Sequence, residues 1–217
     1  MAETLFVDLW SDVVCPFCGL GRAQLDAAIT SFEHGSAVVV RLHAFELDPR
    51  AHDASDVSLE ELIAKKYGRS VEEIRAHHRR LEAQAREYGF RWNFDRARPA
   101  NTFDAHRLIA LATTQDLGGA MISRLFRAYF EEGQFISDHD VLTALAAEVG
   151  VVGASDLWTS DDFVDAVRRD EATATELGLS GVPALVVDEK FLISGAQGVE
   201  AIRGVLERAW ARREVSS

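Results

Sequence analysis

The segment DVVCPFCGLGRAQLDAAI, residues 12–29, carries the only two cysteines of the chain, Cys15 and Cys18. It follows the apolar run TLFVDLW (4–10) and precedes SAVVVRLHAFEL (36–47), which is rich in β-branched residues. The two flanking runs predict strands, whereas the apolar residues after the cysteines recur at helical spacing. The sequence therefore predicts a βαβ unit with the cysteine pair at the start of its helix.

The start of a helix is a place where a thiol becomes reactive. Pro16 fits the first helical turn, because that position needs no backbone N–H and suits the fixed φ of proline. A sulfur there faces unpaired backbone N–H groups and the positive end of the helix dipole, which favour the thiolate. Cys18 lies three residues on, nearly one turn away. We therefore predict that Cys15 attacks a disulfide and that Cys18 resolves the mixed disulfide.

The pair has two other interpretations. A structural zinc ion needs four ligands, and the seven histidines include no His-x3-5-His spacing that would complete a site with the two cysteines. Free cysteines are also often buried as small apolar residues. The position at a helix start favours a redox function over both, so we expect no metal site.

The composition narrows the choice of partners and compartment. The chain of 217 residues has a net charge of -12, so it lacks the basic field that attracts nucleic acid or anionic lipid. Its first residues, MAETLFVDLW, do not form a secretory signal, and no apolar run approaches the ~20 residues that span a bilayer. We expect a cytoplasmic protein with neither nucleic acid nor membrane as a partner.

The middle of the chain is helical. Ser58 with Glu61, and Ser70 with Glu73, each fit a capping box at a helix start. Near the end, PALVVDEKFLISG (183–195) predicts two short strands that turn at Asp188 and Glu189, and a final helix follows. The predicted class is α/β, with a helical insertion in the α/β part.

These features resemble the DsbA family of thioredoxin-fold oxidoreductases, and within it the cytosolic FrnE-like branch. The resemblance implies a thioredoxin fold with a large all-helical insertion: residues 1–50 and 175–217 form a discontinuous thioredoxin-like domain, and residues 51–174 form the insertion. It is carried by SDVVCPFCGLG (11–21), FELDP (45–49), NTFDAHRL (101–108), LFRAYFEEGQFISD (125–138) and GLSGVPALVVDEKFLISGAQ (178–197).

The same resemblance implies a substrate site around the cysteines. The peptide bond between Val182 and Pro183 is expected to be cis, with its loop facing the cysteine pair. Val182 and Pro183 are then candidate substrate-binding residues, together with Pro16 and Phe17 between the cysteines. Phe17 stands where Trp or His is common among relatives, which leaves the redox potential open.

The expected activity is that of a thiol-disulfide oxidoreductase that reduces or isomerises disulfides of proteins or peptides. It needs no cofactor besides the Cys15–Cys18 pair, and glutathione is a candidate reductant. The alternative is a glutathione-dependent transferase or isomerase of the kappa or 2-hydroxychromene-2-carboxylate isomerase type. Such relatives typically use a serine and need no second thiol, so the paired cysteines favour the first interpretation. A binding module without catalysis is the third.

For Asp8 and His106 the sequence leaves two possible roles each. Asp8 is either a buried acid that carries a proton to or from Cys18, or a hydrated acid near the end of its strand. His106 either lines the substrate cleft with Asn101, or is a hydrogen-bonded helix residue that holds the insertion to the thioredoxin-like domain.

Overall fold

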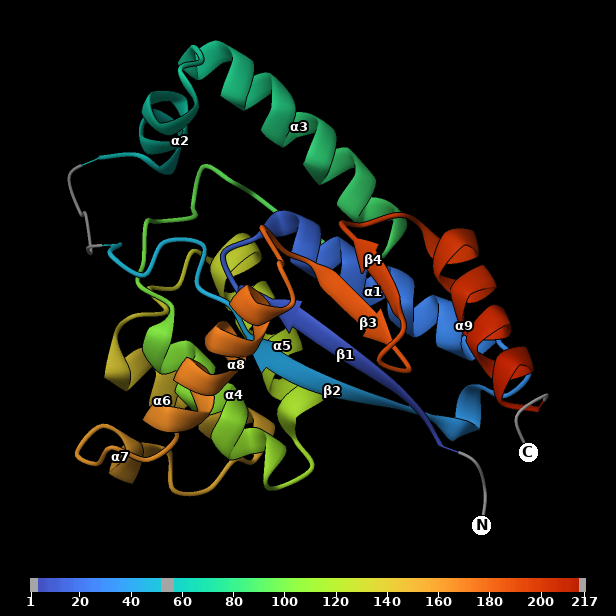
Figure 1. Ribbon diagram of the computed structural model, residues 1–217. Coiled ribbons are helices and arrows are strands. Elements are labelled where there is room, and N and C mark those ends of the chain that lie inside the picture. The colour runs from blue at the N-terminus through green and yellow to red at the C-terminus, as the bar shows by residue number, and fades with distance from the viewer. Residues whose placement is uncertain (1–3, 52–56, 215–217) are drawn as a thin grey trace. The chain divides into compact units, whose positions relative to one another are not determined.

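The computed structural model describes residues 4–51 and 57–214, and its contacts divide the chain into two compact units (Figure 1). One unit joins Met1–Leu47 to Arg168–Ser217, and the other is Asp48–Val167. The sequence predicts one domain of residues 1–50 and 175–217 and another of residues 51–174. A division by contacts does not test whether these parts are domains, so this assignment stays a prediction.

The first unit contains a four-stranded sheet in the order β2-β1-β3-β4. Strand β1 (Leu5–Ser11) pairs parallel with β2 (Val38–Ala44) and antiparallel with β3 (Ala184–Val187), which pairs antiparallel with β4 (Phe191–Ser194). The βαβ unit and the hairpin predicted from the sequence are both present. Asp188 and Glu189 make the turn of the hairpin, with φ values of 53° and 55°. The chain has the predicted α/β class.

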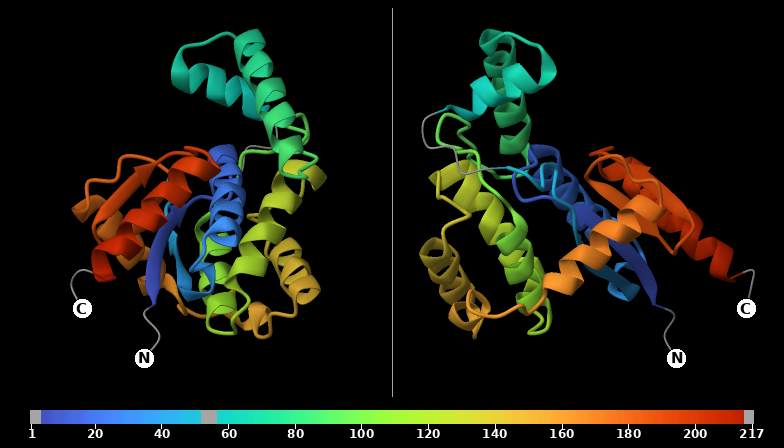
Figure 2. Two further views of the ribbon diagram at one scale, coloured as in Figure 1. Left: turned by 90° about the vertical axis from the view of Figure 1, so that its right-hand side faces the viewer. Right: turned by 60° about the vertical axis from the view of Figure 1, so that its left-hand side comes forward.

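Alternation along β1 gives the two faces of the sheet different neighbours. Leu5, Val7 and Leu9 belong to an apolar cluster with residues of α1 (Pro16–Ser31) and α9 (Val199–Glu214), which lie side by side against this face (Figure 2). Trp10 points to the opposite face and packs with Ala174 of α8 (Val164–Glu176). Helix α1 therefore contacts the odd-numbered residues of β1, and helix α8 contacts the even-numbered Trp10.

The second unit is helical. Its helices are α2 (Leu59–Tyr67), α3 (Val71–Glu87), α4 (Phe103–Thr113), α5 (Gly118–Arg127), α6 (His139–Val149) and α7 (Ala154–Leu157). Helices α4 to α7 contact one another, and α2 contacts α3. A π-helical turn, Ala128–Glu132, follows α5, and its Tyr129 and Phe130 are buried.

Two helix starts in this unit match the sequence prediction. Ser58 and Glu61 form a reciprocal capping box at α2, and Ser70 and Glu73 form another at α3. In each, the hydroxyl accepts from a backbone N–H and the carboxylate accepts from the N–H of the serine. Throughout residues 4–51 and 57–214, the structure has no helix with the length and apolar content required to cross a bilayer.

Candidate active site

The cysteine pair lies where the sequence predicts it. Cys15 is the N-cap of α1, with an extended backbone, and Pro16 is the first helical residue. The carbonyl oxygen of Cys15 accepts from the N–H of Cys18 at 3.0 Å and from that of Gly19 at 3.3 Å. The first helical turn therefore begins between the two cysteines, which are not bonded to each other in this structure.

The two thiols differ in their surroundings. Cys15 is 4% exposed and Cys18 is completely buried, whereas Phe17 between them is 40% exposed. Burial raises the pKa of the Cys18 thiol well above its usual value, and the neighbouring Cys15 raises it further. Cys18 is thus held as a neutral thiol in the first turn of the helix, whereas the preceding Phe17 is exposed.

The bond between Val182 and Pro183 is cis, as the family resemblance implies. The Cys15 thiol donates to the carbonyl oxygen of Val182 at an Sγ–O distance of 3.5 Å. Pro183 directly precedes β3, and its own carbonyl oxygen accepts from the N–H of Gly195 at 2.7 Å. The proline loop is therefore fixed to the sheet on one side and faces Cys15 on the other.

Gly21 allows this loop to approach α1. A Cβ atom on Gly21 would lie 2.8 Å from Cγ of Pro183 and 3.3 Å from its Cβ. The proline ring is rigid and its carbonyl is held, so the ring cannot move aside without the loop. The absence of a side chain at Gly21, one turn beyond Cys18, is what lets the cis proline pack against the helix.

We expect Gly21→Ala to displace the proline loop. The variant should lose about 1–3 kcal/mol of stability, which is typical of an added methyl group in a packed site. Its rate of disulfide reduction should fall by about tenfold or more, because the Val182 carbonyl moves relative to Cys15. Urea unfolding and a disulfide-reduction assay measure the two effects.

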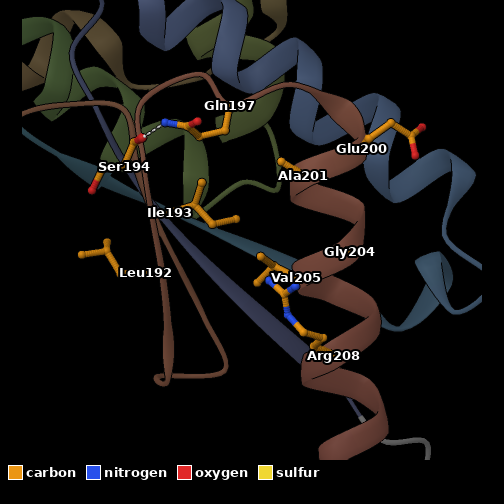
Figure 3. Close-up of a pocket in the computed structure, with 9 residues that line it drawn as sticks. All are labelled: Leu192, Ile193, Ser194, Gln197, Glu200, Ala201, Gly204, Val205 and Arg208. Carbon is orange, nitrogen blue, oxygen red and sulfur yellow. Dashed lines mark hydrogen bonds between the residues drawn. The ribbon is translucent and has the colours of Figure 1, made fainter.

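Gly204→Ala is the matched control. Gly204 is also helical, in α9, where a Cβ would meet no atom within 4 Å. It lines an open groove of about 580 Å³ between β4 and α9 (Figure 3). This variant should keep the wild-type rate and gain up to about 1 kcal/mol from the higher helix propensity of alanine. Equal effects of the two substitutions would contradict the role given to Gly21.

Asp8 does not lie beside Cys18. It shares its strand face with Trp10, which is the face covered by α8, whereas Cys18 belongs to α1 on the opposite face. The Asp8 carboxylate is buried and accepts two hydrogen bonds from Arg41, at 2.7 and 2.6 Å, and one from His43 at 2.7 Å. The hypothesis that Asp8 serves Cys18 is therefore wrong, and so is the alternative of a hydrated acid.

His43 connects Asp8 to α8. Its Nδ1 lies 2.7 Å from a carboxylate oxygen of Asp170, and its ring stacks on Trp10 with a centroid distance of 4.3 Å. Burial lowers the pKa of His43, but the hydrogen bonds to Asp170 and Asp8 outweigh burial and raise it to about 9. His43 is therefore an imidazolium at neutral pH. No spacing in the sequence indicates this cluster, because Asp8, His43 and Asp170 are far apart in the chain.

Asn101 and His106 belong to the second unit. His106 is buried in α4, and Asn101 accepts from the N–H of Phe103 just before the first turns of that helix. Both interpretations of His106, as a residue that lines the substrate cleft with Asn101 and as a helix residue that holds the insertion to the thioredoxin-like domain, stay predictions. Across the residues that the structure describes, no group of three or more His, Cys, Asp or Glu side chains is placed to hold a metal ion.

Known proteins are similar to this chain in sequence and in fold. The DSBA-like thioredoxin domain family matches residues 6–207. The uncharacterized protein YwbO of Bacillus subtilis (strain 168) is 30% identical over 210 residues, which cover 95% of this chain and 96% of YwbO.

Two solved structures extend the comparison. One, described as a probable DsbA oxidoreductase from Streptomyces coelicolor, has a TM-score of 0.91 and 32% identity, and the match covers 95% of this chain and 90% of that one. The cytosolic disulfide reductase DsbM from Pseudomonas aeruginosa has a TM-score of 0.65 at 20% identity, over 95% of this chain and 98% of its own.

Proposed function

Because the chain belongs to the DSBA-like thioredoxin domain family, we propose that it reduces or isomerises disulfides of proteins or peptides through Cys15 and Cys18. The observation that carries this proposal is the arrangement at the start of α1. Cys15 is the N-cap residue, Cys18 is buried nearly one turn on, and the cis-proline loop lies at hydrogen-bond distance from the Cys15 thiol.

The reaction has two steps. The Cys15 thiolate attacks one sulfur of a substrate disulfide, so that a mixed disulfide forms and the first substrate thiolate leaves. Cys18 then attacks the Cys15 sulfur, which forms the Cys15–Cys18 bond and releases the second substrate thiolate. The substrate gains two electrons and the cysteine pair loses two, so an external thiol such as glutathione must reduce the pair again.

Substrate binding is assigned to the surface next to Cys15. Phe17 is 40% exposed, and Val182 packs in an apolar cluster with Trp10 and Phe45. An extended peptide that approaches Cys15 would meet the exposed Phe17 and the half-buried Pro16 and Val182, while the buried Pro183 holds the loop in place. This surface fits apolar segments of unfolded chains, which bear the disulfides that a reductase or isomerase must reach.

The direction of the reaction follows from the expected compartment. Cytosolic glutathione is poised between about -220 and -320 mV, depending on the method. Stabilisation of the Cys15 thiolate by the helix start favours the reduced pair and raises its potential. In that compartment, which we propose for this protein, the pair is a mostly reduced dithiol that removes or rearranges disulfides. The motifs around Cys15 and Pro183 support our assignment of the chain to the FrnE-like branch.

The order of reactivity tests the assignment of the two thiols. With the reduced protein at mildly acidic pH, we expect an alkylating reagent to modify Cys15 well before Cys18. The reason is that burial raises the pKa of Cys18 and closes access to it. Peptide mapping by mass spectrometry identifies the modified residue. Preferential modification of Cys18 in the folded protein would overturn the assignment.

A further inference from the structure

Strand β4 is an edge of the sheet, and its outer side has no strand partner within residues 4–51 and 57–214. The N–H of Gly195 donates to the carbonyl oxygen of Pro183 at 2.7 Å, which makes these two residues a hydrogen-bonded pair. Hydrogen-bonded and non-hydrogen-bonded pairs alternate along an antiparallel ladder, so the backbone groups of Leu192 and Ser194 point to the outer side. The edge therefore offers hydrogen-bond donors and acceptors to another strand.

Only part of this edge is covered. The carbonyl oxygen of Ser194 accepts from the side-chain amide of Gln197 at 2.6 Å (Figure 3). Among the residues that the structure describes, this leaves the N–H and the carbonyl oxygen of Leu192, and the N–H of Ser194, open to a new partner. Leu192 is 54% exposed, and β4 itself contains no charged residue and no proline, which commonly protect an edge strand from pairing.

The groove between β4 and α9 carries opposite charges about two helical turns apart. On its α9 side, Glu200 lies at one end and Arg208 at the other, and the small Ala201 and the apolar Val205 lie between them. Glu200 is exposed and pairs with Arg203 of the same helix. Arg208 is exposed as well, and in the described part of the chain it makes no ion pair or side-chain hydrogen bond. The groove thus presents an acid and an unpaired cation on one side of the molecule.

These features are complementary to a second copy of the same chain. Figure 3 shows β4 and α9 side by side, with Leu192 level with the middle of the stretch between Glu200 and Arg208. A twofold axis beside Leu192 pairs β4 antiparallel with its copy and places the two α9 helices antiparallel on one face of the joined sheet. Each Glu200 then faces Arg208 of the other copy. The edge is therefore complementary to itself in charge as well as in hydrogen bonding.

We propose that two copies of the chain associate through this edge, so that their two four-stranded sheets become one. At the axis, the N–H of each Leu192 donates to the carbonyl oxygen of the other, and the two side chains lie together on one face. Only 9 residues line the groove, whereas a standard interface has about 20–30 residues a side. The dimer is therefore weak and reversible, with a Kd in the micromolar range. This inference does not depend on the proposed function, because none of these residues takes part in the reaction of the cysteines.

Sedimentation velocity of the wild-type protein, from about 5 to about 500 µM in about 0.15 M salt, measures the association. We expect the sedimentation coefficient to rise from that of a monomer to that of a dimer across this range. Leu192→Lys places two like charges opposite each other at the axis and should stay monomeric throughout. A wild-type chain that is monomeric at every concentration would overturn the proposal, as would be expected if the edge instead receives a strand of a different protein.

Charge reversal tests the contacts between the two helices. Glu200→Arg alone, or Arg208→Glu alone, puts like charges opposite each other across the axis and should weaken association by about tenfold or more. The double variant restores opposite charges and should recover the wild-type Kd to within about threefold. An equimolar mixture of the two single variants should associate as well, because every contact between the two different chains then joins opposite charges.

Glu207→Arg is the matched control, because Glu207 pairs with Arg203 as Glu200 does but does not line the groove. It should change the Kd by less than about twofold. Far-UV circular dichroism verifies that each variant keeps its helices. A dimer that tolerates both single reversals, or that returns neither in the double variant nor in the mixture, would overturn the contacts of Glu200 and Arg208. If a reversal variant fails to fold, Leu192→Lys decides: a dimer that survives this substitution lies elsewhere on the molecule and contradicts the proposal.

Discussion

We expect Cys15→Ser to lose disulfide reductase activity by about 10³-fold or more, because it removes the nucleophile on which both steps depend. The serine hydroxyl stays protonated at neutral pH and forms no mixed disulfide. The assay is the reduction of a disulfide-containing peptide with glutathione as the terminal reductant. Far-UV circular dichroism of the variant should match the wild type, since the residue is an N-cap without a side-chain capping bond.

Cys18→Ser is the matched variant and should fail at a different step. Its Cys15 still attacks the substrate, so mixed disulfides accumulate and are detected as adducts by mass spectrometry. Equal losses without any adduct would contradict the order of the two thiols. Full turnover with glutathione in the absence of Cys18 would show that glutathione resolves the mixed disulfide, and would contradict the role given to Cys18.

The second prediction with a large effect is that the free energy of unfolding depends on pH through His43. The pKa of His43 is raised from 6.5 to about 9 by Asp170 and Asp8, against the opposing effect of burial. A raised pKa means that the folded state holds the proton more tightly than the unfolded state. The stabilisation is therefore complete below pH 6.5 and is lost as the pH rises to about 9, and it amounts to at most about 3 kcal/mol.

His43→Asn removes this titration. The charged groups facing His43 are Asp8 from β1, Arg41 beside it on β2, and Asp170 from α8. In urea unfolding we expect the variant to be less stable than wild type below pH 6.5, with a difference that shrinks towards pH 9. A difference that is constant with pH would show that His43 stabilises the fold by packing on Trp10 alone.

The features predicted from the sequence either depend on residues close together in the chain or follow from the family resemblance. Pro16 as the first helical residue, the capping boxes at Ser58 and Ser70, and the turn at Asp188 each depend on residues within a few positions of one another. The cis bond before Pro183 followed from the resemblance and not from its own residues.

The features that escaped prediction depend on which helix covers which face of the sheet. Asp8 and Trp10 lie on one face of β1, but strand alternation does not reveal that α8 covers that face and α1 the other. The contact of Gly21 with Pro183 and that of His43 with Asp170 join distant parts of the chain.

The central claim is that Cys15 and Cys18 form a reversible redox couple. Equilibration of the wild-type protein with glutathione buffers, followed by differential alkylation and mass spectrometry, tests it most directly. We predict that both thiols disappear together in one two-electron transition, that they return on reduction, and that the midpoint lies at or above the cytosolic range of about -320 to -220 mV. Thiols that remain free under every buffer, or a bond that stays oxidised far below that range, would contradict the account.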